Sequence, residues 1–204
     1  MASDNDQEKQ GGEGAAFRQA LRLRLRNERI AAREALLATE HESKSAAVLE
    51  YLYQHLSQRA PSLLAFYWPI RAEVDCRPLI QRLMALDWRS CLPVVVKRDA
   101  ALAFRVWTPD SLMVPGEYGI PVVSIGEAVA PGVILLPVNA FDNAGYRLGY
   151  GGGYFDRTLA SMHPRPYTIG VGFDLARVDS IRPCAHDVAL DALATESEFT
   201  CFPI

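Results

Sequence analysis

The segment from residue 133 to residue 159 constrains the fold more than any other part of this chain. A strongly apolar run at residues 133–138 is typical of a buried strand, and a helical pattern begins at Tyr154. Between them lies Arg147-Leu-Gly-Tyr-Gly-Gly-Gly153, which has glycine at four of five consecutive positions. A buried strand that passes through a glycine loop into a helix is typical of an α/β fold.

Short apolar runs alternate with helical patterns along the rest of the chain. Strands are expected at residues 63–68, 92–96, 101–107, 167–173 and 188–193. Helices are expected at residues 16–37, 43–59, 78–87 and 154–162, and a proline-rich loop at residues 108–131. This order predicts a single α/β domain with a mostly parallel sheet and helices on both faces, which is a three-layer α/β/α arrangement.

Composition excludes several classes of protein. Half of the 204 residues are hydrophobic and the net charge is -3, which excludes a largely disordered chain and disfavours a nucleic-acid binder. No run of about 18 apolar residues occurs, so no membrane contact through a span is expected. The four cysteines form no C-x-x-C pair, which is typical of a reduced, cytoplasmic protein. Residues 1–15 are polar and glycine-containing, and we expect a flexible leader there before a domain at residues 16–204.

The glycine loop is predicted to bind phosphate. Glycines lack the Cβ atoms that keep a ligand from the backbone, and the following helix offers free N–H groups and its positive dipole end. Arg147 adds a bidentate donor that suits phosphate oxygens. The loop is neither a Walker A loop nor a dinucleotide-binding fingerprint, because Tyr154 stands where the third glycine of the latter belongs. The alternative is a tight turn that merely requires glycine.

The first expected helix carries a row of arginines beside an apolar stripe. At about 100° per residue the row spans an arc of about 80° and consists of Arg18, Arg22, Arg26, Arg29 and Arg33. The row is either a solvated basic face or an arm that closes a polyphosphate pocket, for which arginine has suitable bidentate geometry.

Three further places hold candidate ligand contacts. Asp156 lies in the first turn of the helix after the glycine loop, either as an acid favoured by the helix dipole or as a Mg²⁺ ligand beside bound phosphate. The aromatic residues 66–68 and Glu73 follow an expected strand, where a flat heterocycle could stack and donate ring N–H groups to the carboxylate. Core aromatics and a solvated glutamate are the alternative. A small polar set near the C-terminus consists of His186, Asp187 and Asp191.

Residues 140–157 resemble the signature of the 5-formyltetrahydrofolate cyclo-ligase family. Weaker segments of the same family follow in the expected order, namely Arg22-x-x-Leu25-Arg26 with Arg33, Tyr67-Trp-Pro-Ile with Glu73 and Asp75, Tyr118-Gly-Ile-Pro121, Ile169-Gly-Val-Gly-Phe173, and His186-Asp187 with Asp191. The resemblance covers about residues 22–196. It implies ATP-dependent, Mg²⁺-requiring cyclisation of 5-formyltetrahydrofolate to 5,10-methenyltetrahydrofolate, with release of ADP and phosphate.

The resemblance also implies a role for each matching position. Arg147 and Tyr154 would be catalytic. The residues implied in ATP binding are Arg22, Arg26, Arg147, Leu148, Gly149, Tyr150, Gly151, Gly152, Gly153, Tyr154 and Phe155. Those implied in folate binding are Trp68, Glu73, Tyr150, Gly151, Gly152, Gly153 and Tyr154, and Mg²⁺ would be held by Asp156 and Asp191. Trp68 departs from the aliphatic residue found there in some relatives.

The implied reaction needs no protein nucleophile, since phosphoryl transfer to the formyl oxygen activates the formyl carbon for attack by N10 of the folate. Two alternatives stay open. One is a non-catalytic relative that binds folate or nucleotide, and the other is a phosphosugar enzyme with the same type of loop. In the preferred hypothesis the partners are ATP and 5-formyltetrahydrofolate, polyglutamylated forms included, with no nucleic acid and no membrane. We expect this enzyme to be a cytoplasmic monomer.

Overall fold

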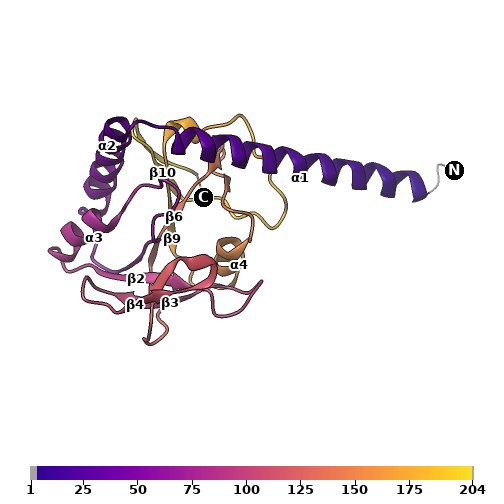
Figure 1. Ribbon diagram of the computed structural model, residues 1–204. Helices are drawn as coiled ribbons and strands as arrows, with labels where there is room; N and C mark the ends of the chain where they lie inside the picture. Colours follow the sequence, from indigo (N-terminus) through magenta and orange to yellow (C-terminus); the bar gives the residue numbers. More distant parts are fainter. Residues whose placement is uncertain (1–3, 204) are drawn as a thin grey trace.

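A seven-stranded sheet forms the centre of the computed structural model, which describes residues 4–203 (Figure 1). Its strands stand in the order β11-β10-β9-β6-β1-β2-β3. Their bounds are β1 Leu63–Ala65, β2 Arg89–Val94, β3 Ala103–Trp107, β6 Val133–Pro137, β9 Tyr167–Val171, β10 Ala192–Ala194 and β11 Phe199–Cys201. The five strands from β10 to β2 are parallel, and antiparallel strands β11 and β3 form the two edges. The prediction of a mostly parallel sheet is confirmed.

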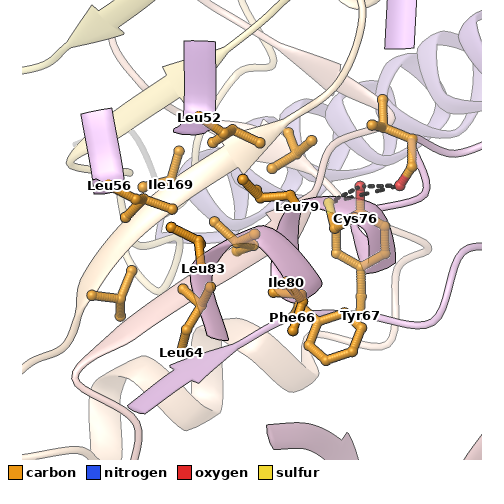
Figure 2. Packing of buried hydrophobic residues seen from close by; sticks show 14 of the residues in the cluster. Leu52, Leu56, Leu64, Phe66, Tyr67, Cys76, Leu79, Ile80, Leu83 and Ile169 are labelled. Atoms are coloured by element: carbon orange, nitrogen blue, oxygen red, sulfur yellow. Dashed lines mark hydrogen bonds between the residues drawn. The ribbon is translucent and has the colours of Figure 1, made fainter. Parts of the chain in front are cut away.

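Helices cover both faces of this sheet (Figure 1). Helices α2 (Ala38–Leu56) and α3 (Arg77–Met84) pack on one face, and α4 (Tyr154–Ser161) packs on the other. Successive side chains of a strand point to opposite faces, so Leu135 of β6 joins the cluster under α2 and α3 whereas Ile134 joins the cluster under α4. Figure 2 shows part of the first cluster, in which leucines of α2 and α3 meet β1 and β9. The three-layer prediction is confirmed.

The segment at residues 108–131, which its prolines predict to be a loop, is not a loop throughout. It contains a hairpin of β4 (Met113–Pro115) and β5 (Pro121–Val123), joined by the 3₁₀ turn η1 (Glu117–Gly119). Strand β4 ends and β5 begins with proline, and the two prolines face each other. A two-stranded ribbon tolerates them because each strand has a free edge that needs no N–H donor.

A second short ribbon leads into the glycine loop. It pairs β7 (Ala140–Phe141) with β8 (Arg147–Leu148). The buried carboxylate of Asp142 fixes the turn between them by accepting hydrogen bonds from the backbone N–H groups of Ala144 and Tyr146, at 3.1 Å each. Arg147 therefore enters the glycine loop from a fixed position next to the main sheet.

Helix α1 (Asp4–Glu34) begins twelve residues before the helix expected from residue 16 (Figure 1). Its C-terminal half docks on the domain through buried Leu25, Ile30 and Arg33, whereas its N-terminal half projects away from it. Helix propagation from a docked nucleus needs only one new bond per residue, so polar residues can extend it. Residues 1–3 of the expected leader lie outside the described residues, and the division into leader and domain stays a prediction. Within the part of the chain that the structure describes, no helix has the length and apolar character of a membrane span.

Candidate active site

A cavity of about 670 Å³ opens at the carboxyl ends of the parallel strands. Tyr67 follows β1, Val95 follows β2 and Pro137 ends β6, and all three line the cavity. The glycine loop and helix α1 form further walls. Open α/β sheets bind ligands at this edge, and the volume lies in the range of small-molecule sites.

The structure brings nearly all of the predicted site residues to this one cavity. Those that line it are Arg22, Arg26, Trp68, Glu73, Arg147, Leu148, Gly149, Tyr150, Gly151, Gly152, Gly153, Tyr154, Phe155 and Asp156. Asp191 is the one predicted site residue that does not line it. Segments more than 100 residues apart in the chain therefore meet at this cavity. If the arginine row were only a solvated face and the glycine loop only a tight turn, the two would not need to meet.

Three glycines of the loop have different structural roles. Gly151 has a φ of 101° and Gly153 a φ of 64°, both in the region that favours glycine. A Cβ at Gly151 would also lie 3.3 Å from the guanidinium of Arg26. Gly149 has open space around its Cα, and its carbonyl oxygen accepts a 2.6 Å hydrogen bond from Nε of Arg26. The loop is thus tied to α1, and Gly153 caps the helix α4 that follows.

Two arginines that face the cavity are each paired with a carboxylate. Arg22 donates to both carboxylate oxygens of Asp187, at 3.0 and 2.9 Å. Burial opposes the charge of Arg22, but Asp187 more than offsets it, so the pKa of Arg22 is raised. Arg147 donates to Oδ1 of Asp156 at 3.0 Å and to the carbonyl of Val188 at 2.6 Å. A phosphate that binds here has to compete with these carboxylates for the guanidinium groups.

Arg26 differs from these two arginines. Burial, together with the charge of nearby Arg22, lowers the pKa of Arg26. Its side chain contacts the carbonyl of Gly149 and has no carboxylate partner among the ion pairs of the described residues. Arg22 and Arg26 are neighbouring positive charges, and only Arg22 is paired with a carboxylate. The two side chains therefore leave a local excess of positive charge that an anionic ligand would neutralise.

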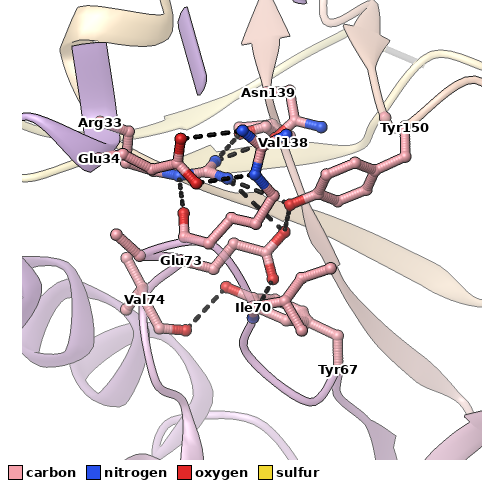
Figure 3. A network of polar contacts seen from close by, with 12 residues as sticks. Arg33, Glu34, Tyr67, Ile70, Glu73, Val74, Val138, Asn139 and Tyr150 are labelled. Atoms are coloured by element: carbon pink, nitrogen blue, oxygen red, sulfur yellow. Dashed lines mark hydrogen bonds and ion pairs between the residues drawn. The ribbon is translucent and has the colours of Figure 1, made fainter. Parts of the chain in front are cut away.

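The cavity lining also includes aromatic side chains and the buried carboxylate of Glu73, whose polar contacts Figure 3 shows. Glu73 is 6% exposed, and its Oε1 accepts a 2.9 Å hydrogen bond from the phenol of Tyr150. Its Oε2 accepts from the backbone N–H of Ile70 at 3.0 Å. Burial raises the pKa of Glu73 above its ordinary value. Trp68 also lines the cavity, with the guanidinium of Arg77 4.6 Å from its ring centre.

The two predicted metal ligands do not meet. Asp156 lines the cavity, whereas Oδ2 of Asp191 accepts hydrogen bonds from the backbone N–H and the hydroxyl of Thr168, at 2.7 Å each. Thr168 lies at the start of β9 and pairs with Ile134 at the start of β6, whereas the cavity lies at the other end of β6, at Pro137. Asp191 is therefore engaged at the amino ends of the parallel strands, away from the cavity at their carboxyl ends.

Four further residues lie at the cavity or next to it. The family resemblance gives none of them a catalytic or ligand-binding role, although Arg33, Tyr118 and Asp187 occur in the motifs that carry it. Arg33 and Asn139 are buried beside Glu73, Asp187 pairs with Arg22, and Tyr118 approaches Tyr154 with its phenol oxygen 3.4 Å away. Tyr118 has a φ of 59°, which is uncommon outside glycine and often marks a functional position. Asn139 could have been found as a polar residue directly after an apolar strand, and Arg33 by its place in the arginine row.

Comparison with known proteins points to one family. The model of the 5-formyltetrahydrofolate cyclo-ligase family matches residues 16–196. The 5-formyltetrahydrofolate cyclo-ligase of Haemophilus influenzae is 29% identical over 178 residues, which cover 83% of this chain and 94% of that protein. The protein of the same name from Mycolicibacterium smegmatis is 35% identical over 142 residues, which cover 63% of this chain and 71% of that protein.

Solved structures agree. The NMR structure of the Aquifex aeolicus 5,10-methenyltetrahydrofolate synthetase has a TM-score of 0.77 at 28% identity, covering 89% of this chain and 92% of that one. Fold and cavity together define an α/β protein with a glycine-rich loop, arginines and aromatic side chains around one cavity at the carboxyl ends of its parallel strands. This chain belongs to the 5-formyltetrahydrofolate cyclo-ligase family, a family of ligases, and the resemblance found in its sequence is confirmed.

Proposed function

We propose that this protein catalyses the ATP-dependent cyclisation of 5-formyltetrahydrofolate to 5,10-methenyltetrahydrofolate, with release of ADP and phosphate. One observation carries the proposal: a single cavity of about 670 Å³ is lined by a phosphate-type loop with arginines and by an aromatic wall with a buried carboxylate. The reaction needs a polyphosphate and a flat heterocycle side by side, and these two walls suit them.

The phosphate end is the glycine loop with Arg22, Arg26 and Arg147. The N-terminus of α4 offers free backbone N–H groups, and the glycines let phosphate oxygens approach the backbone closely. Arg22 and Arg147 supply guanidinium forks once phosphate replaces their carboxylate partners. Together they neutralise the charge that develops on a transferring phosphoryl group.

The folate end is the wall with Trp68, Glu73 and Tyr150. A carboxylate oxygen has two lone-pair sites, so Glu73 can accept ring N–H groups beyond the hydrogen bonds from Ile70 and Tyr150. The indole of Trp68 offers a face for stacking a flat ring. This supports an orientation in which the pterin lies against Glu73 and the formyl group points toward the loop.

The chemistry then follows from positioning. The formyl oxygen attacks the γ-phosphorus, the bond to the β-phosphate oxygen breaks, and ADP leaves. N10 attacks the activated formyl carbon and the ring closes. The carbon–oxygen bond then breaks to release phosphate, which takes up the proton that N10 loses. Arg147 and the loop amides stabilise the phosphoryl group throughout, and Tyr154, the first residue of α4, is proposed to contact it as well.

Mg²⁺ is also part of the proposal. When bound with ATP it would offset the charge of the phosphate oxygens. Asp156 fits this role, because it lines the cavity and its Oδ2 accepts no hydrogen bond among the described contacts. The hydrogen bonds of Asp191 to Thr168 do not support Asp191 as the second ligand. Mg²⁺ commonly takes one or two carboxylates together with substrate phosphates, so Asp156 and phosphate oxygens can suffice.

We further propose that the protein works as a cytoplasmic monomer and accepts polyglutamylated folates. All four cysteines are free, which supports a reducing compartment. Arg71 lines the cavity and is about half exposed, so an anionic tail could bind its guanidinium if it displaced the present partner, Glu34, at 2.7 Å.

The test is a turnover assay with purified protein, Mg·ATP and 5-formyltetrahydrofolate. We expect methenyltetrahydrofolate absorbance to appear together with one ADP per product. Absence of turnover in a folded sample would overturn the proposal. Equilibrium binding without phosphate release would instead indicate a non-catalytic relative, and thermal stabilisation by sugar phosphates but not by folates would indicate a phosphosugar enzyme.

A further inference from the structure

Arg33 is buried at the end of α1 although it carries a charge, with only 4% of its surface exposed. Burial of a guanidinium costs free energy unless its donors are bonded. Its Nε donates to the carbonyl of Arg71 at 3.0 Å, its Nη1 to Oδ1 of Asn139 at 3.0 Å, and its Nη2 to the phenol oxygen of Tyr150 at 3.2 Å. One side chain thus joins three separate segments around the cavity (Figure 3).

The contact with Tyr150 has a defined direction. Arginine has donors and no acceptor, so the phenol oxygen of Tyr150 must accept from Arg33 and its own proton is left to donate. That proton goes to Oε1 of Glu73, 2.9 Å away. Nη2 of Arg33 also lies 4.0 Å from the same carboxylate oxygen. Arg33 therefore acts on the carboxylate both through the phenol and through its charge.

The partners of Arg33 belong to the cavity rather than to the general core. Arg71, Glu73 and Tyr150 all line it. Arg105 offers a comparison within the same chain, because its Nη1 binds only the backbone carbonyls of Val123 and Ser124 in the hairpin strand β5 and after it. Arg33 instead orients two ionisable side chains that a folate would touch.

We propose that Arg33 is a positioning residue for the folate site, one that holds the phenol of Tyr150 and, through it, the carboxylate of Glu73 in the geometry that receives the pterin. The inference rests on the proposed function and adds a residue that contacts neither substrate. Arg33 lies on the same helix as Arg22 and Arg26, which line the cavity, so a loss of folate binding without a loss of ATP binding separates the action of Arg33 on Tyr150 from the seating of α1.

The test compares R33Q and R33K with the control R24Q. Arg24 lies on the same helix with a side chain that is 66% exposed and only an exposed Glu28 as partner. We expect R33Q to raise both KM and the equilibrium Kd for 5-formyltetrahydrofolate at least tenfold, with less than a threefold change for ATP. R33K keeps the charge but not the fork, and we expect an intermediate loss. R24Q should match the native protein in both ligands.

A merely structural role is separated by Y150F and the double variant R33Q/Y150F. Y150F keeps the ring but removes the donor to Glu73, so it should raise the folate Kd as well. If Arg33 acts through the phenol, the double variant loses less than the product of the two single losses. Melting temperatures show whether R33Q folds, and R33K with Y150F carries the test if it does not.

Two results would overturn the inference. One is a native folate Kd in R33Q, or in R33K if R33Q does not fold, and the other is an equal loss of folate and ATP affinity. Independent, multiplicative losses in the double variant would assign Arg33 a role that does not pass through Tyr150. If the native protein itself binds folate but does not turn it over, the proposed function fails while the binding comparison still tests Arg33.

Discussion

Arg22 and Asp187 form a two-pronged ion pair across 165 residues of chain, with both oxygens of the carboxylate bound to the guanidinium. Burial favours the neutral form of Asp187, yet Arg22 and the backbone N–H of Cys184 hold its pKa below the ordinary value. The pair ties α1 to the C-terminal segment at the rim of the cavity. The arginine that we propose to bind phosphate therefore already has a carboxylate partner in this structure.

Asp187→Asn is expected to lower the KM for ATP about two- to fivefold. Because the pair is only partly buried, its net contribution is about 0.5–1 kcal/mol, and ATP no longer has to displace a charged partner. Steady-state kinetics with ATP as the varied substrate measures the effect. Asp179→Asn is the control, since Asp179 is exposed in the same segment. A higher KM for ATP would show that Asp187 aims Arg22 rather than competing for it.

Arg147→Ala is expected to weaken ATP at least tenfold and folate by less than threefold, whereas Glu73→Ala does the reverse. Arg147 stands in the glycine loop beside Asp156, and Glu73 stands in the aromatic wall. Charge-assisted hydrogen bonds to phosphate or to a heterocycle are each worth about 1.5–3 kcal/mol. Equilibrium binding of both ligands to both variants gives the four numbers. Equal losses for the two ligands would contradict this division of the cavity.

Gly151→Ala is expected to reduce kcat/KM for ATP at least tenfold, whereas Gly149→Ala keeps it within about threefold. At Gly151 the φ of 101° strains any other residue, and a Cβ would lie 3.3 Å from the Arg26 guanidinium. At Gly149 a Cβ would meet no atom within 4 Å. Steady-state kinetics with ATP as the varied substrate measures kcat/KM for both variants, and their melting temperatures show whether both are folded. The opposite order would mean that ligand contacts at Gly149 outweigh backbone geometry.

The pH dependence of stability should carry the signature of Glu73. Burial raises its pKa in the folded state, so its contribution is fully present below the ordinary pKa of glutamate and is lost as the pH rises through the raised value. The free energy of unfolding in urea, measured from pH 4 to pH 7, should therefore fall less steeply, or rise more steeply, with pH in Glu73→Gln than in the native protein. A slope difference of the other sign would mean that Arg33 outweighs burial.

Leu79→Ala is expected to lower the free energy of unfolding by about 2–5 kcal/mol without changing either KM. Leu79 is a residue of α3 and is fully buried in the cluster between α3 and the sheet, which Figure 2 shows. Urea unfolding of the variant measures the loss. Gln81→Ala, at an exposed position of the same helix, should change the free energy by less than about 0.5 kcal/mol. A changed KM in Leu79→Ala would show that α3 is coupled to the cavity.

Many helices and strands of the fold can be predicted from local sequence patterns. The apolar run at residues 133–138 forms a central parallel strand, because a strand buried on both faces is apolar throughout. The helical pattern that begins at Tyr154 forms α4. The hairpin at β4 and β5 is not legible, because its prolines are typical of loops and only pairing with a neighbouring strand reveals it. The length of α1 is likewise misjudged, since its glycines argue against helix.

The candidate site divides in the same way. The sequence alone is sufficient to identify the family and to predict most of the residues that line the cavity. The signals are the glycine spacing, the adjacent arginine and the order of the motifs along the chain. The hydrogen-bond and ion-pair partners of these residues cannot be predicted in this way, because a sequence contains no distances between residues far apart in the chain. Only the tertiary structure pairs Arg22 with Asp187, binds Asp191 to Thr168 away from the cavity, and buries Arg33 against Tyr150. Burial of a charge demands a partner, and which partner is within reach is decided by how the sheet and α1 pack together.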